Sequence, residues 1–198
     1  MRFALNVPRP SLTILALFLA VIFPFGLAQA SQSSIMCGKA KLSLASPTYL
    51  VAGSVIVAVE LPSGWIKEEG KGSPFFLLRA GDRSETATTL IYVNVQRLSS
   101  SFDQAVSNDA REFRTSDPSA QITEEPTPEI LESGCPARTQ RFVYQQNHKT
   151  YVDEVTKIGI NGLLLNVVLS SEVGSEIERY QKEYEFVLKH LALVAPAE

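Results

Sequence analysis

The sequence predicts an α+β fold in which a mostly antiparallel β-sheet is covered by α-helices. Three observations lead to this prediction. Strand-like and helix-like segments follow one another in the order strands, helix, strands, helix, and the last three strands are joined by turns of hairpin length. Each helical segment also carries one apolar stripe that needs a sheet to cover it. The pattern leaves open which faces of the sheet the helices cover.

The first 30 residues have the three parts of an export signal. Arg2 and Arg9 provide the positively charged end, Leu12 to Phe23 form an apolar segment, and Ala30 ends an A-x-A cleavage site. An uncleaved membrane anchor is the alternative, but a spanning helix needs about 20 apolar residues and a proline interrupts this segment earlier. We therefore expect a signal peptide at 1–30, cleaved after Ala30, and a protein of the periplasm or the extracellular space.

The rest of the chain has the length of one domain. Residues 31–50 are rich in serine and suggest an N-terminal extension, and residues 51–195 suggest a single α+β domain. Loss of Arg2 and Arg9 reduces the 18 basic residues to 16 against 21 acidic ones, a net charge of −5. This acidic, mixed surface argues against binding to nucleic acid and to anionic membranes. No segment after residue 30 has the length and hydrophobicity for stable membrane insertion.

Cys37 and Cys135 are the two cysteines of the chain. In an oxidising compartment they favour one disulfide, which would tie the N-terminal extension to the loop before residue 136. Two free thiols and a metal-binding pair are the alternatives, and the metal pair is disfavoured because no histidine or further cysteine lies at ligand spacing. A lipoprotein modified at Cys37 is disfavoured because the bulky Met36 precedes it.

The first half of the domain predicts three strands and a helix. The strands are the β-branched, apolar run at 54–61, ended by Pro62, and the segments 73–81 and 88–98. The helix covers 101–115, where Ser101 and Gln104 form a capping box. Its apolar stripe consists of Phe102, Ala105, Val106, Ala110 and Phe113.

The second half begins with a short strand and a proline-containing loop within 121–134. Three strands then form an antiparallel meander at 137–146, 151–158 and 163–171. Asn161-Gly162 is a strong hairpin signal, because a type I′ turn needs a positive φ at both central residues. The longest helix opens at a second capping box, Ser175 to Glu178. Its apolar residues keep helical spacing for four turns: Ile177, Tyr180, Tyr184, Val187, Leu188 and Leu191.

The order of these segments resembles the PsbP-like group, which includes the extrinsic photosystem II subunit, a Ran-binding nuclear import factor and DcrB-like envelope proteins. The resemblance rests on "ELPSGW" after the first strand, the capped helix "SFDQAVSNDAREF", the meander and the closing helix, and covers roughly residues 50 to 194. It implies an α/β/α sandwich around an antiparallel sheet. It also implies docking or assembly rather than catalysis, and it carries over no residue with a chemical role.

Catalytic candidates are few. His148 lies in the turn "QNHK" and His190 near the end of the last helix, where solvation and the helix dipole explain them without catalysis. Adjacent carboxylates such as Asp153 and Glu154 point to opposite faces of a strand and cannot act as a pair across a cleft. The sequence lacks G-x-S-x-G, a phosphate-binding loop and metal-ligand spacing. We therefore expect no catalytic residues, no metal and no cofactor.

Aromatic residues remain as candidates for a binding surface. Trp65 could rim a groove beside the first strand, and Tyr92 and Tyr144 could stand on a sheet face that is partly exposed. The competing interpretation is that all three are core residues, because large aromatic side chains are the main core filler. For "LPSGW" we favour a chain reversal in which Pro62 ends the strand, Gly64 permits the turn and Trp65 folds back on the core.

Together these features predict an exported, non-enzymatic docking or assembly module whose partner is another envelope macromolecule, most simply a protein. A carrier of a small apolar ligand, with a pocket between sheet and helix, is the alternative. A hydrolase of unknown type is the third hypothesis.

Overall fold

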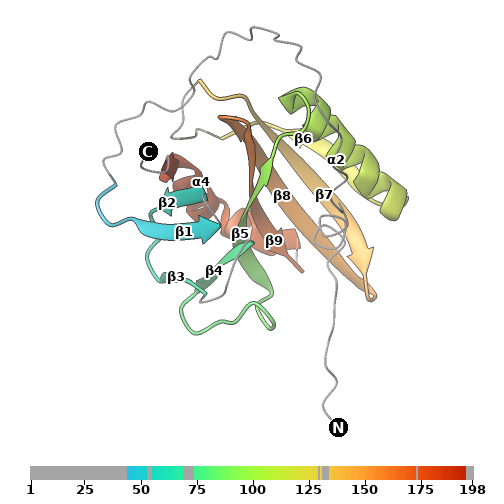
Figure 1. Ribbon diagram of the computed structural model, residues 1–198. Helices are drawn as coiled ribbons and strands as arrows, with labels where there is room; N and C mark the ends of the chain where they lie inside the picture. The colour runs from blue at the N-terminus through green and yellow to red at the C-terminus, as the bar shows by residue number, and fades with distance from the viewer. Residues whose placement is uncertain are drawn as a thin grey trace, which may run out of the picture.

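A computed structural model describes residues 44–52, 55–68, 74–128, 130, 134–172 and 174–194. Its main element is a seven-stranded antiparallel sheet with the strand order β3-β4-β5-β9-β8-β7-β6 (Figure 1). The strands are β3 (Trp65–Lys67), β4 (Phe75–Arg79), β5 (Thr89–Arg97), β6 (Gln121–Glu125), β7 (Ala137–Gln146), β8 (Lys149–Ile160) and β9 (Leu163–Ser171). This confirms the predicted fold class, the strands within 73–81 and 88–98, and the three-strand meander.

The turns of the meander have the predicted backbone geometry. Asn161 and Gly162 have φ values of 48° and 75° between β8 and β9. Asn147 and His148, with φ values of 51° and 63°, make the equivalent two-residue turn between β7 and β8. Positive φ at both central residues matches the right-handed twist of the flanking strands, so these hairpins are set by local sequence.

A second, three-stranded antiparallel sheet has the order β1-β2-β10. Its strands are β1 (Thr48–Ala52), β2 (Val55–Val59) and β10 (Leu191–Val194). The strand predicted at 54–61 therefore forms, but in the small sheet rather than the main one. Two further expectations are corrected: β1 begins inside the segment 31–50 that was predicted to be an extension, and Leu191 belongs to a strand rather than to the last helix. Both strands pair with β2: β1 precedes it by two residues and forms a hairpin with it, whereas β10 reaches it from the far end of the chain.

Three helices accompany the sheets in the described residues: α2 (Phe102–Ser116), α3 (Gly174–Arg179) and α4 (Gln181–Lys189). The capping of α2 is confirmed, because the Ser101 hydroxyl accepts a hydrogen bond from the Gln104 backbone N–H at 3.3 Å. The single last helix is corrected to two, since the chain leaves helical geometry at Tyr180, with φ −100° and ψ 11°. The Tyr180 ring is held there by Trp65, at 5.8 Å between ring centroids, and by two arginines.

The helices lie on opposite faces of the large sheet (Figure 1). On one face, Phe113 of α2 packs edge-on against Phe142 and Tyr144 of β7. On the other face, the buried Tyr184 hydroxyl of α4 donates to Thr156 Oγ1 and accepts from the Thr156 N–H, and the small sheet shares this core. The faces that the sequence left open are thus decided: α2 covers one, and α3, α4 and the small sheet cover the other.

Candidate functional site

The three aromatic residues proposed from the sequence are all buried. Trp65, 5% exposed, lies in the core between the large sheet, α3, α4 and the small sheet. Tyr92 and Tyr144 lie on the opposite face, in one cluster that also contains Phe113 of α2. The expectation of an exposed sheet face around Tyr92 and Tyr144 is therefore wrong, because this face of the sheet belongs to a second core rather than to the surface.

The turn at "LPSGW" has the form predicted from the sequence. The Trp65 N–H donates to the Pro62 carbonyl at 3.0 Å, and Gly64 has a φ of 78°. The chain then enters β3 at Trp65, a short strand that the sequence analysis missed. This stretch accordingly positions the indole in the core.

The large apolar side chains that are exposed in the described residues are Tyr49 and Val51, each 53% exposed, and Ile66, 42% exposed. Tyr49 and Val51 lie on β1 on either side of Leu50, which is fully buried, so strand alternation turns them away from the core. Their register partners on β2 are Ala58, which is buried, and Ile56, which is half-buried. We call Tyr49, Val51 and Ile56 the β1 surface.

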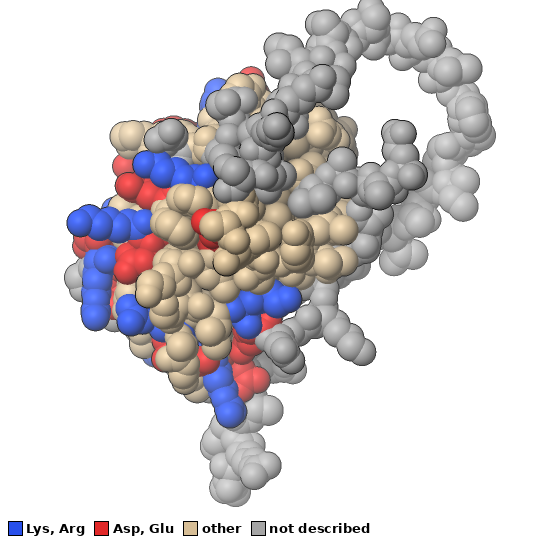
Figure 2. All heavy atoms as spheres, turned by 90° about the vertical axis from the view of Figure 1, so that its left-hand side faces the viewer, with Lys and Arg blue, Asp and Glu red and all other residues tan. Residues whose placement is uncertain are grey.

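The surroundings of the β1 surface include a charged side chain, that of Lys67. Figure 2 shows the side of the molecule on which β1 and β2 lie in Figure 1, and uncharged atoms form a continuous area there beside a group of charged side chains. Lys67 of β3 reaches β1, where its Nζ donates to the Tyr49 carbonyl oxygen at 3.3 Å. This contact joins β3 to β1, an edge strand of the small sheet.

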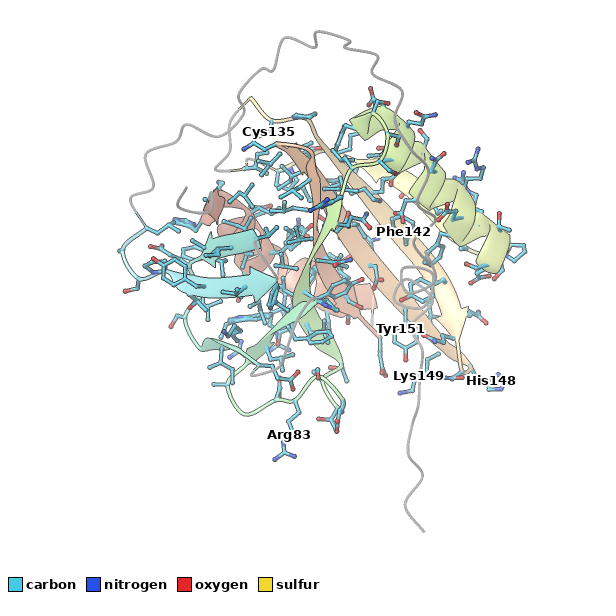
Figure 3. All side chains as sticks on the ribbon, in the orientation of Figure 1. Arg83, Cys135, Phe142, His148, Lys149 and Tyr151 are labelled. Carbon is cyan, nitrogen blue, oxygen red and sulfur yellow. The ribbon has the colours of Figure 1, made fainter. Side chains whose placement is uncertain are left out.

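Aromatic and charged side chains lie together near the end of the β7–β8 hairpin, where Figure 3 labels His148, Lys149 and Tyr151. Tyr144 stacks on Tyr151, with ring centroids 5.6 Å apart, and its hydroxyl donates to Asp153 Oδ2 at 3.2 Å. Lys149 Nζ lies 2.6 Å from Glu172 Oε2, and the hydrogen bond to that carboxylate raises the pKa of Lys149. These contacts join β8 to the residue after β9 and stabilise the hairpin.

The two histidines occupy different environments. His148 is exposed at the tip of the β7–β8 hairpin, as the sequence predicted (Figure 3). His190 follows α4; its Nδ1 lies 2.8 Å from the Phe186 carbonyl oxygen and its ring stacks on Phe186. Among the described residues, neither ring is hydrogen-bonded to a serine or cysteine side chain.

One cavity bears on the carrier hypothesis. It has a volume of about 220 Å³ and lies where the segment after α2 meets the β7–β8 hairpin. Its lining consists of Ser119, Gln121, Val143, Tyr144, Gln145 and Thr150. This mixed, largely polar lining differs from the apolar pocket that the carrier hypothesis expects.

Metal ligands and membrane-spanning helices are the next two features. Within the described ranges, no three His, Cys, Asp or Glu side chains are grouped as metal ligands would be. No helix in the same part of the chain combines the length and hydrophobicity of a membrane span.

Cys135 packs against the core shared by the two sheets, whereas Cys37 lies outside the described residues, so the disulfide remains a prediction. If the bond forms, reducing agent should lower the melting temperature of the protein, because the crosslink restricts the unfolded chain. Thermal unfolding with and without dithiothreitol, together with alkylation of the native protein, checks this. An unchanged melting temperature with both cysteines alkylated would contradict it.

Comparison with solved structures places the fold among known ones. The structure of LpqN, described as involved in cell envelope biogenesis of Mycobacterium tuberculosis, matches with a TM-score of 0.53 and 12% identity, over 75% of this chain and 91% of LpqN. A cyanobacterial PsbP from Synechocystis sp. PCC 6803 matches with a TM-score of 0.47 and 15% identity, over 78% and 96%. The Ran-binding protein Mog1p of Saccharomyces cerevisiae matches with a TM-score of 0.41 and 12% identity, over 70% and 85%.

These similarities concern the fold. LpqN shares it, and the two groups named by the sequence resemblance, PsbP and the Ran-binding factor, are among the matched structures. No protein-family model matches the chain, and no curated protein matches its sequence.

Proposed function

We propose that the chain is an exported, non-enzymatic docking module that binds a protein partner through the β1 surface. The observation that carries this proposal is the exposure of Tyr49 and Val51, side by side on one strand, in a domain that buries its other large aromatic candidates. Exposed apolar side chains that lie next to one another favour protein contact, whereas scattered ones need no explanation. Tyrosine is also enriched at interfaces, because its ring is apolar and its hydroxyl can stay hydrated.

The chemistry around the β1 surface favours a protein over the other macromolecules. A net charge of −5 after loss of the signal peptide is unfavourable for nucleic acid and for anionic lipid. The predicted signal peptide would deliver the chain to the cell envelope or beyond. LpqN, which shares the fold, is described as an envelope biogenesis protein, and an envelope partner is the corresponding proposal for this chain.

The test compares binding by three proteins made with their native export signal. The double variant Tyr49→Ser, Val51→Ser should lose a partner that the wild-type protein retains after crosslinking in envelope fractions of the source cells, identified by mass spectrometry. Ile66→Ser, which removes an exposed apolar side chain from β3, serves as the matched control and should retain the same partner. Because both sites are exposed, all three melting temperatures should agree within about 2–4 °C.

Other outcomes would decide against the proposal. If the double variant retains the partner as the wild type does, the β1 surface is not the docking site. If native mass spectrometry instead finds a lipid or other small molecule on the wild-type protein, and no protein partner, the carrier function replaces docking.

A further inference from the structure

Glu154 is a carboxylate in an unusual position. It lies on β8, on the face of the large sheet that α3 and α4 cover, and is only 7% exposed. Its one hydrogen bond to a side chain among the described contacts comes from a neutral group: Gln181 Nε2, at the start of α4, donates to Glu154 Oε1 at 3.0 Å. A buried carboxylate has lost the water that stabilises its charge, and a hydrogen bond from a neutral donor offsets only part of this free-energy cost.

Few positive charges compensate this carboxylate. Arg141 of β7 is its register partner, but the ion pair that Arg141 makes, at 3.7 Å, is with Glu178 of α3. Two further carboxylates act on Glu154 electrostatically: Glu125 of β6 and Glu185 of α4. The Arg141 guanidinium is thus a single positive charge near several carboxylates, which lie on four different elements.

Two further neighbours of Glu154 in the described residues are uncharged. Its register partner on β9 is Leu169. Thr156, two residues along β8 on the same face, is occupied by the Tyr184 hydroxyl. Protonation of Glu154 would therefore remove both a buried charge and repulsion between carboxylates, while the ion pair of Arg141 with Glu178 and the hydrogen bond from Gln181 can remain.

We propose that Glu154 makes the packing of α3 and α4 on the large sheet sensitive to pH, tighter in mild acid than at neutral pH. The effect would extend to the small sheet, because β10 follows α4 after one residue and pairs with β2. This inference does not depend on the docking function.

The direction follows from the linkage between protonation and folding. Burial raises the pKa of Glu154 above its ordinary value of 4.5, while Gln181 and Arg141 lower it to a smaller extent. The folded protein therefore binds this proton more tightly than the unfolded chain does. Stability from this group rises as the pH falls through the folded-state pKa, is complete below 4.5, and is lost again as the pH rises.

The first test is the variant Glu154→Gln, which resembles the protonated side chain and keeps an acceptor for Gln181. At pH 7.5 its melting temperature should exceed that of the wild type by about 2–4 °C, and the difference should shrink to nothing as the pH approaches 4.5. Glu112→Gln, an exposed glutamate on α2, is the matched control and should show no such trend. The proposal would be overturned if Glu154→Gln melted below the wild type at pH 7.5. It would also be overturned if the difference between the two melting temperatures were the same at every pH.

The second test monitors the packing of α3 and α4 by tryptophan fluorescence. Trp65 is the one tryptophan of the chain, and its ring meets Tyr180 between α3 and α4. Its fluorescence should change with pH in the folded wild type, with a midpoint above 4.5, and this transition should be absent from Glu154→Gln. An unchanged emission between pH 4.5 and 7.5, or a transition that persists in the variant, would contradict a role for Glu154.

Discussion

Trp65→Ala is expected to lower the free energy of unfolding by about 3–5 kcal/mol. The indole is 5% exposed in the core shared by the large sheet, the small sheet and the last two helices. It also meets the Tyr180 ring edge-on, at 5.8 Å between centroids, where α3 ends and α4 begins. Alanine would leave a cavity at the junction of these elements and release the contact that holds Tyr180.

Urea unfolding followed by far-UV circular dichroism measures this effect without relying on tryptophan fluorescence. Trp65→Phe is the control, since it keeps an aromatic ring and should lose less stability than Trp65→Ala. The Trp65 Nε1 atom is buried with no hydrogen-bond partner among the described groups, so phenylalanine would leave no acceptor unpaired there. If Trp65→Ala unfolds like the wild type but loses a partner, the indole would be a binding residue instead.

Asp109→Ala is expected to cost about 2–3 kcal/mol of unfolding free energy, although half of the aspartate side chain is exposed. The reason is its partner. Lys157 of β8 is 1% exposed beneath α2, and its Nζ lies 2.8 Å from Asp109 Oδ2, 2.8 Å from Gln140 Oε1 and 5.0 Å from the centre of the Phe142 ring. Removal of the carboxylate leaves a buried ammonium with a neutral acceptor and an aromatic face, which compensate it only in part.

A double-mutant cycle with Lys157→Met tests this explanation. Methionine fills similar space without a charge, so Asp109→Ala should cost far less in the Lys157→Met background than in the wild type. Asp103→Ala is the matched control on the same helix: its ion pair with Arg138, at 2.9 Å, is exposed on both sides and should be worth less than about 1 kcal/mol. If Asp109→Ala lowers the unfolding free energy no more than Asp103→Ala does, the buried Lys157 ammonium does not need the Asp109 carboxylate.

The candidate site shows where inference from the sequence failed. The sequence offered Trp65, Tyr92 and Tyr144 as a possible binding surface because they are large aromatic residues, and the structure buries all three, which confirms the competing interpretation that they are core residues. It passed over Tyr49, which lies in the segment 31–50 predicted as an extension, and Val51, the first residue of the predicted domain. The β-branched, apolar run from Thr48 to Val51 after Pro47 was the available signal. Its exposed side could not be recognised, because that depends on which strand pairs with β1 and which face that sheet turns inward.

Nothing in the sequence indicated that Glu154 is buried. It was considered there only as one of two adjacent carboxylates, and carboxylates are seldom buried. Strand alternation does send them to opposite faces, as predicted, but both faces of β8 are covered. Only the positions of α2 on one side and of α3 and α4 on the other decide that both carboxylates are buried.

What the sequence by itself determined is the local structure: the α+β class, the capped helix α2, the hairpins at positive-φ turns and the reversal at Pro62–Trp65. Each depends on contacts within a few residues, so local pattern is sufficient. The tertiary structure alone decided that β10 joins β1 and β2 in a separate sheet, that the last helix breaks at Tyr180, and that Tyr49 reaches the surface. These outcomes depend on pairing and packing between residues far apart in the chain, which a periodic pattern does not specify.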